Sequence, residues 1–361
     1  MPVLRGVVTI LKREYWGLRA NTLLLLVVLI LPVSMGLMFG TLKNIAPKSA
    51  PAGIFPEPGA TEDDIRAANG VLSLFSKTGV EPGFDENKLY REEYYFFISV
   101  PPGFRNGIAE IKVYVDSSMS PVSELSPYVK DMILYGLSKW YNWEPKISIV
   151  RVGKNALPFQ YLVPGIVVLL ASAIGLIMVP FSLSQDKEVL SRVLLNVRLG
   201  SFVAGKLAFA SILALAQFLI LLLTQHLAGA PGAFFIINPG SISTLLLSCV
   251  FFTSLGLSIM FFTSFGEAGK QINALLLGST VLFSGALYPV GFFPPVPGFG
   301  DILQTIGRSN PAYFFVVLMR GFGIRGLGPE ILSDYLAIGF AFTLLSILIF
   351  AYSVQRRKKN G

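Results

Sequence analysis

Long apolar runs dominate the hydrophobic pattern of this chain, and short charged segments separate them. A run of about 20 residues is enough to cross a hydrocarbon core of about 30 Å. Such runs predict six membrane spans, at residues 22–42, 159–183, 207–227, 242–263, 272–290 and 335–354. The alternative for the first run is a signal peptide, but the run is longer than a typical signal core. The pattern predicts an α-helical polytopic membrane protein.

Residues 43–158 form the one long stretch with a mixed pattern, and they predict a small α/β domain between the first two spans. After a Pro/Gly-rich linker at 50–60, Thr61 and Asp64 resemble a capping box that starts a helix running to about Lys77. Segments 94–100, 111–115 and 147–152 are typical of strands. Ser126-Pro127 predicts the start of a second helix. The domain shows no catalytic signature, and we expect its carboxylates on the solvated surface.

Two amphipathic segments flank the spans. Residues 1–21 place apolar side chains at helical spacing opposite basic ones, which predicts an elbow helix along the inner leaflet, with a simple flanking anchor as the alternative. In residues 184–206, five apolar positions from Val189 to Val197 form one helical face. Charges on the other face are too costly to bury in lipid, so this helix must lie on the membrane surface or dock into a partner.

Residues 291–326 are apolar, but prolines interrupt them. Irregular backbone is tolerated at membrane depth only where protein or a water-filled cavity covers it. We expect one or two short re-entrant helices before the last span; a hydrophobic surface loop is the alternative.

Charge sets the orientation. The chain is 53% hydrophobic and 14% charged, against about 25% charged in soluble domains. Residues 1–21, 184–206, 264–271 and the basic tail 355–361 hold 13 Lys and Arg against 4 acids, whereas 43–158 hold 13 against 14. The positive-inside rule therefore predicts cytoplasmic termini and an extracytoplasmic 43–158 domain. No basic stripe with interleaved aromatics suggests nucleic acid as a partner.

Little in the sequence supports chemistry of its own. One cysteine, Cys249, and one histidine, His226, cannot assemble a metal or nucleophile constellation. Gly200–Lys206 satisfies most of a phosphate-loop pattern, but residue 207 is Leu, no strand precedes the motif, and a span follows at once. We expect no catalytic residues, no metal and no cofactor bound by this chain.

Several motifs in order resemble permease subunits of type-2 ABC exporters over nearly the whole chain. They are Asp186–Leu190 followed by Gly205-Lys206, Ile98–Phe104 with its Pro-Pro-Gly-Phe ending, Val113–Asp116, Phe283–Pro289, and Asn310–Tyr313 with Arg320 after it. Glu188-Val189 and Asn196-Val197 stand where the family usually has Gly-Thr and a Pro.

The resemblance implies that 184–206 is a coupling helix that inserts into a separate cytoplasmic ABC ATPase subunit, which holds ATP and Mg. The coupling residues would be Asp186, Lys187, Glu188, Leu190, Arg192, Val193, Leu194 and Arg198, and the re-entrant or gate residues Pro289, Pro294, Pro311, Tyr313 and Arg320. It also implies a second permease copy, identical or related, in the lipid bilayer of a prokaryotic cell membrane.

The expected function is ATP-driven export of an amphipathic or lipid-like substrate, because the spans are apolar and aromatic with few charges. Two other classes stay open. A membrane-anchored receptor or scaffold would use the outer domain to bind a ligand or protein. An ion-driven secondary transporter would be expected to carry paired acidic residues in its spans, and none is evident.

Overall fold

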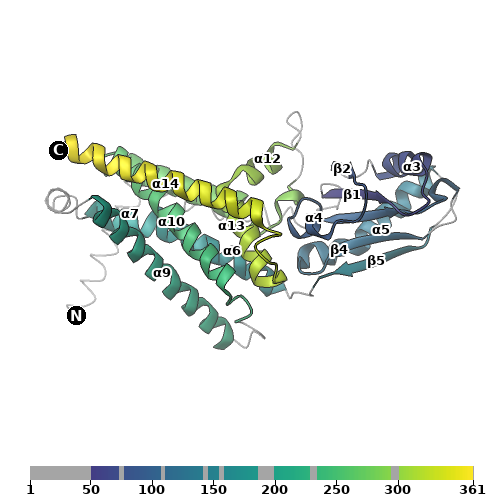
Figure 1. Ribbon diagram of the computed structural model, residues 1–361, viewed down its shortest axis with the longest axis horizontal. Helices are drawn as coiled ribbons and strands as arrows, with labels where there is room; N and C mark the ends of the chain where they lie inside the picture. Colours follow the sequence, from purple (N-terminus) through teal and green to yellow (C-terminus); the bar gives the residue numbers. More distant parts are fainter. Residues whose placement is uncertain are drawn as a thin grey trace, which may run out of the picture.

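The computed structural model describes residues 50–72, 77–106, 110–140, 145–153, 158–185, 199–227, 234–293 and 301–360. A sheet domain lies at one end of an elongated molecule and a bundle of long helices forms the rest, with the C-terminus at the far end from the sheet (Figure 1). The predicted elbow helix 1–21, the first span 22–42 and most of the coupling helix lie outside the described residues.

The sheet domain contains five strands in the order β2-β1-β3-β4-β5. Their bounds are β1 Pro51–Pro56, β2 Lys77–Val80, β3 Phe96–Val100, β4 Ile111–Asp116 and β5 Ile147–Val152. Strand β1 pairs in parallel with both β2 and β3, β3 pairs antiparallel with β4, and β4 pairs in parallel with β5. The three predicted strands are present, and β5 has the predicted bounds.

The prediction of a linker at 50–60 is wrong, because β1 occupies it and is an inner strand of the sheet. Its glycine is required by packing rather than by flexibility: a Cβ on Gly53 would lie 2.8 Å from the ring of Phe97. Pro51 stands at the first strand position, where a missing N–H is tolerated. Proline and glycine therefore occur in this segment because they fit strand β1, and not because the segment is a linker.

Helices α3 (Glu62–Leu72) and α5 (Ser120–Trp140) belong to the sheet domain. The capping box is present: the Thr61 amide donates to Asp64 Oδ2 at 3.0 Å, and the Asp64 amide donates to Thr61 Oγ1 at 3.3 Å. Helix α3 ends at Leu72, before β2, rather than near Lys77. A short helix, α4 (Glu86–Tyr90), precedes β3 and was not predicted.

The prediction that α5 starts at Ser126-Pro127 is also wrong, since α5 begins at Ser120 and contains Pro127. Proline has no N–H to bond the carbonyl four residues earlier. The hydroxyl of Ser126 donates to that carbonyl, the oxygen of Ser123, at 2.7 Å. The Ser-Pro pair resembles a helix start, but here it lies inside a helix, where the serine hydroxyl supplies the hydrogen bond that proline cannot donate.

The membrane part consists of long helices with two π-helical segments. Helix α6 (Pro158–Ala173) continues through π-helix η4 (Ile174–Met178) into α7 (Val179–Gln185), and α9 (Leu199–Leu227), α10 (Pro239–Phe262) and α11 (Glu267–Phe283) follow. After the 3₁₀ turn η5 (Val290–Phe292), α12 (Ile302–Ser309) and α13 (Pro311–Arg320) are short. The π-helix η6 (Gly321–Arg325) then leads to α14 (Ser333–Asn360).

Four described helical stretches are long and apolar enough to span a membrane: Gln160–Phe181, Ser201–Leu223, Pro239–Phe262 and Ser333–Lys359. They match the predicted second, third, fourth and sixth spans. Helix α11, at the predicted fifth span, has 17 residues and is not among them. The chain is a polytopic membrane protein, and the count of six spans stays a prediction.

The described part of the predicted segment 184–206 differs from expectation at both ends. Helix α7 runs to Gln185, and α9 is already helical from Leu199. Gly200–Lys206 therefore belongs to the first turns of the long helix α9. A regular helix cannot wrap its backbone around phosphates as a phosphate loop does, so the structure gives a second reason to reject that motif.

Helix α10 lies at the centre of the bundle and crosses η4 with almost no space between the backbones. A Cβ on Gly256 would lie 2.3 Å from the carbonyl oxygen of Gly175, and a Cβ on Gly175 would lie 2.4 Å from the amide nitrogen of Thr253. The amide of Asn273, on α11, donates to the Gly256 oxygen at 3.1 Å. Small residues permit this close crossing of membrane helices.

We predict that Gly256→Ala strongly lowers the thermal midpoint of the detergent-solubilised protein, because the new methyl group has no space. Gly278→Ala on α11 is the matched control, since a Cβ there meets nothing within 4 Å. In a helix interior the control should be neutral or stabilising by up to about 1 kcal/mol. Equal midpoints for the two variants would contradict the close crossing.

A second prediction concerns pH. Burial favours the neutral form of Asp64, but backbone hydrogen bonds from Arg105, Thr61 and Gly103 outweigh it and lower the pKa of this carboxyl to about 2. An unfolded Asp has a pKa of roughly 3.9. The contribution of Asp64 to stability is therefore present above about pH 4 and lost as pH falls toward about 2.

Asp64→Asn should destabilise the protein at neutral pH, and its difference from the wild type should shrink on acidification, as measured by thermal melts across pH. Asp63→Asn is the control, because that side chain is 62% exposed and pairs only at the surface. A difference between wild type and Asp64→Asn that stays constant with pH would show that the ionised form is not what stabilises the fold.

Candidate functional site

The predicted coupling residues, Asp186 to Arg198, lie outside the described residues. The helices that flank them are described. Lys270 Nζ, in the first turn of α11, lies 5.9 Å from the ring centroid of Phe181 on α7, and Phe202 on α9 packs against Phe261 at the end of α10. Arg357 near the C-terminus donates to Ser264 just after α10, at 3.1 Å. Both flanking helix ends therefore lie at the end of the bundle away from the sheet domain (Figure 1).

Four of the five predicted gate residues are described, and Pro294 is not. Pro289 is buried and precedes η5, Pro311 is the first residue of α13, and Tyr313 is buried against Phe314 and Tyr335. Helix α13 is buried along nearly all its length and packs against α6, α10 and α14. The structure thus places the predicted gate residues around one short buried helix, and their role as a gate stays a prediction.

Arg320 ends α13 and is fully buried where the sheet domain meets the helices. Its Nη2 donates to the carbonyl oxygens of Gly285 at 2.8 Å and Ala286 at 3.2 Å, in the segment after α11. Its Nη1 donates to Glu92 Oε1 at 3.3 Å, and its guanidinium stacks 3.9 Å from the ring centroid of Tyr161 on α6. One side chain therefore connects α6, α11, α13 and the sheet domain.

Arg325, in η6, makes the second connection to the sheet domain. Its Nε donates to Asp116 Oδ2 at 2.9 Å and to Ser118 Oγ at 3.0 Å, at the end of β4. Its Nη1 donates to the carbonyl oxygen of Tyr90 at 2.6 Å, and its Nη2 lies 3.6 Å from Glu92 Oε1. We call Glu92, Asp116, Arg320 and Arg325 the junction cluster, in which two carboxyl side chains face two guanidinium groups.

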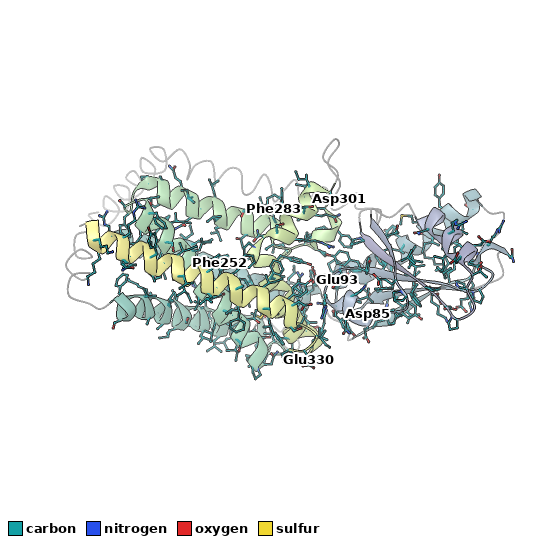
Figure 2. The ribbon with its side chains drawn as sticks, turned by 45° about the horizontal axis from the view of Figure 1, so that its top comes forward. Asp85, Glu93, Phe252, Phe283, Asp301 and Glu330 are labelled. Carbon is teal, nitrogen blue, oxygen red and sulfur yellow. The ribbon has the colours of Figure 1, made fainter. Side chains whose placement is uncertain are left out.

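The backbone of Glu92 itself is strained. Its φ is +59°, in the turn that ends α4, a position where helices usually place Gly or Asn. A larger residue there costs on the order of 1–3 kcal/mol and persists only when its surroundings demand it. The surroundings require this conformation here, because the Glu92 carboxylate lies between two buried arginines. Figure 2 shows the neighbouring Glu93 at the junction between the sheet domain and the helices.

The sequence predicted only Arg320 of this cluster, and the expectation that the outer carboxylates are solvated is wrong for three of them. Asp64, Glu92 and Asp116 are 4%, 0% and 1% exposed. A signal was present: Arg320 and Arg325 stand five residues apart in an apolar segment, where unpaired charges are too costly. The partners are more than 200 positions away, so sequence spacing alone does not identify them.

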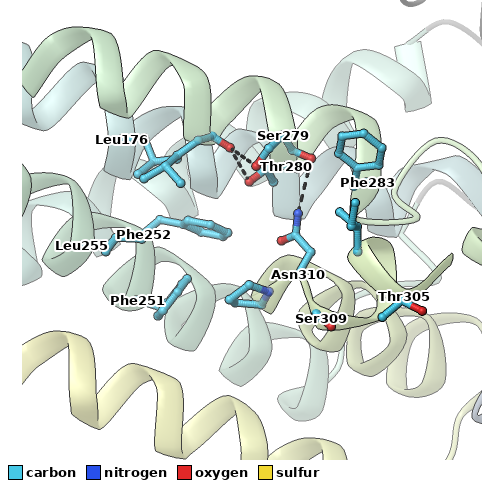
Figure 3. A pocket seen from close by; sticks show the side chains of 13 residues that line it. Leu176, Phe251, Phe252, Leu255, Ser279, Thr280, Phe283, Thr305, Ser309 and Asn310 are labelled. Atoms are coloured by element: carbon cyan, nitrogen blue, oxygen red, sulfur yellow. Dashed lines mark hydrogen bonds between the residues drawn. The ribbon is translucent and has the colours of Figure 1, made fainter. Parts of the chain in front are cut away.

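A pocket of about 400 Å³ lies between α10, α11 and the junction of α12 with α13 (Figure 3). Its inner wall is apolar and includes Leu176 of η4 with Phe251, Phe252 and Leu255 of α10. Ser279, Thr280, Thr305, Ser309 and Asn310 add polar atoms along the other side. None of the described residues that line it carries an ionised side chain.

Asn310 spans the side of this pocket and caps α13. Its Oδ1 accepts from the Ala312 amide at 3.0 Å, and its Nδ2 donates to the Ser279 oxygen of α11 at 3.3 Å. This bond is drawn in Figure 3. The side chain thus ties the start of α13 to α11, as Arg320 ties its end to the segment after α11.

Long apolar helices packed around the short buried helix α13 are typical of a polytopic membrane protein. A family model described as ABC-2 family transporter protein matches residues 22–352. The chain belongs to this family and is an ABC transporter permease. Comparisons with curated proteins and with solved structures give no match.

We predict that Arg320→Ala destabilises the protein by about 3–5 kcal/mol, because it leaves Glu92 buried with one partner fewer. Arg105→Ala is the control, since that exposed side chain pairs only with exposed Asp63 and should cost less than about 1 kcal/mol. Thermal midpoints in detergent measure both variants.

Combining Arg320→Ala with Glu92→Gln tests the pairing itself. If the two groups interact directly, the double variant should lose clearly less than the sum of the single losses. Additive losses would show that Arg320 stabilises the junction only through the Gly285 and Ala286 oxygens and the Tyr161 ring.

Proposed function

We propose that this permease exports an amphipathic or lipid-like substrate, driven by ATP that a separate cytoplasmic ATPase subunit hydrolyses. A second permease copy, identical or related, completes the path. The observation that carries the proposal is the family match over residues 22–352 together with the arrangement of the helix ends that flank segment 186–198. The sheet domain stands on the extracytoplasmic side in this proposal.

The charges of the described helix ends support this orientation. Arg356, Arg357, Lys358 and Lys359 end α14 at the far end from the sheet domain. The end of α7 and the start of α9 lie at that same end, so segment 186–198 must connect there. The positive-inside rule favours the cytoplasm for a positively charged end, which supports a cytoplasmic position for the proposed coupling helix.

The pairing of buried charges supports the substrate class. Within the described helices, Arg320 and Arg325 are neutralised by Glu92 and Asp116, and Glu267 at the start of α11 pairs with Lys270 at 2.6 Å. Transporters of small ions would be expected to keep paired acids at membrane depth. An amphipathic molecule fits apolar walls better, which also weighs against a secondary transporter.

Purification from native membranes tests the class. An affinity-tagged chain should recover an ATP-binding subunit in stoichiometric amount after mild detergent extraction. A receptor or scaffold would purify without it, and that result would overturn the proposal.

We predict that reversing Glu188 and Arg192 together (Glu188→Lys with Arg192→Glu) separates ATP hydrolysis from transport. These charges would set the register of the helix in the ATPase cleft. The assay is ATPase activity and transport in proteoliposomes that hold permease and ATPase subunits. Normal transport by the double variant would reject the coupling assignment.

The matched control exchanges Glu267 and Lys270, a pair with 60% and 30% exposed side chains at the same end of the bundle. This exchange reverses two charges in the same way, but outside the proposed coupling segment. It should leave ATP hydrolysis and transport coupled.

A further inference from the structure

The pocket beside Asn310 is divided into an apolar interior and a polar edge. Phe251 and Phe252 are 5% and 3% exposed, so the pocket reaches deep into the bundle. The hydroxyls of Ser279 and Thr280 both donate to the Leu276 oxygen, at 3.0 and 2.9 Å, and Thr305 donates to the Asp301 oxygen at 3.2 Å. The protons of these three hydroxyls are therefore used inside their own helices, and the edge offers no ionised group to a ligand.

The pocket opens sideways, toward the surface that faces lipid. Ile306 of α12 lines it and is 44% exposed, and Leu275, one turn before Ser279 on α11, is 59% exposed. Large aliphatic side chains exposed beside an opening in a membrane helix bundle lie against hydrocarbon rather than water. The opening between α11 and α12 therefore leads from the bilayer into the bundle.

The size and lining define what can fill the pocket. Its volume of about 400 Å³ lies within the range of about 300–1,000 Å³ usual for small-molecule sites. The apolar interior suits apolar guests, since water there would find few polar partners. A charged head group would also find no counter-charge in the lining. A hydrocarbon chain satisfies each of these conditions.

We propose that this pocket binds one acyl chain of an amphipathic lipid, which enters sideways between α11 and α12. The chain lies against Phe251, Phe252 and Leu255, and the polar part of the lipid stays at the edge near Asn310. Identifying this lipid with the transported substrate rests on the proposed function; binding of the chain does not. Residues 22–42 and a second copy of the permease are the other possible occupants.

Photolabelling of the full-length chain tests the proposal. The protein is reconstituted in phosphatidylethanolamine and phosphatidylglycerol vesicles that contain a phospholipid with a diazirine at the end of one acyl chain. After irradiation, labelled peptides are identified by mass spectrometry. Label on the buried residues Phe251 and Phe252, with the partly buried Leu255 beside them, reports an acyl chain inside the pocket, because lipid around the protein reaches exposed positions such as Leu219 on α9.

Ser279→Trp should lower the label on these three residues by about tenfold or more, because the indole takes the space of the chain. It should leave the label on α9 unchanged. Leu275→Trp, at an exposed position of the same helix, is the control and should keep the label in the pocket. Thr305→Trp fills the pocket from the opposite wall and replaces Ser279→Trp if that variant does not fold.

Three results would overturn the proposal. Label confined to exposed positions in the wild type would show that no acyl chain enters. Unchanged label in both filled variants would place the chain elsewhere. A photoreactive benzoylphenylalanine in place of Ile306 that crosslinks to residues 22–42 or to a second copy, and not to lipid, would show that protein fills the pocket.

The labelling and the purification of an ATPase subunit are separate measurements. Pocket labelling without a recovered ATPase subunit would leave a lipid site in a protein of another class. A recovered ATPase subunit without pocket labelling would keep the proposed function and remove the site.

Discussion

Two buried arginines near the end of an apolar helix are the constraint on which this structure depends. Arg320 and Arg325 cannot remain unpaired at that depth, and the carboxylates that neutralise them, Glu92 and Asp116, come from the sheet domain. The helix bundle therefore requires the sheet domain in one position. The strained backbone of Glu92 is the local cost of that requirement. A buried ion pair is weak evidence for added stability, but displacing one partner from the other leaves a buried charge uncompensated.

The junction cluster also determines which parts can move separately. Arg320 holds the oxygens of Gly285 and Ala286, and a Cβ on Gly165 of α6 would lie 2.1 Å from that Ala286 oxygen. The ends of α6 and α13 nearest the sheet domain, and the segment that follows α11, are therefore packed together with that domain. Between this packed region and the far end of α7 lies η4, a segment without regular α-helical bonding. Such π-helical segments often occur at functional positions.

Local features of the fold could be predicted from the sequence, and features set by distant contacts could not. The capping box at Thr61 and Asp64 and the strand 147–152 depend on neighbouring residues, and both are present. The strand β1 was missed because the glycine at position 53 is required by packing against the ring of Phe97, which is 44 positions away. The junction cluster was missed for the same reason. Arg320 was predicted only by resemblance, since its partner Glu92 lies 228 positions earlier in a domain with balanced charge.

One short helix connects the two features that the sequence did not reveal. Helix α13 begins at Asn310, beside the pocket, and ends at Arg320, in the junction cluster. Its ten residues extend about 15 Å, and it is buried along nearly all of that length. A rigid, close-packed element transmits displacement rather than absorbing it. A guest that separates α11 from α12 therefore acts on the Asn310–Ser279 bond first, and through α13 on the arginines that position the sheet domain.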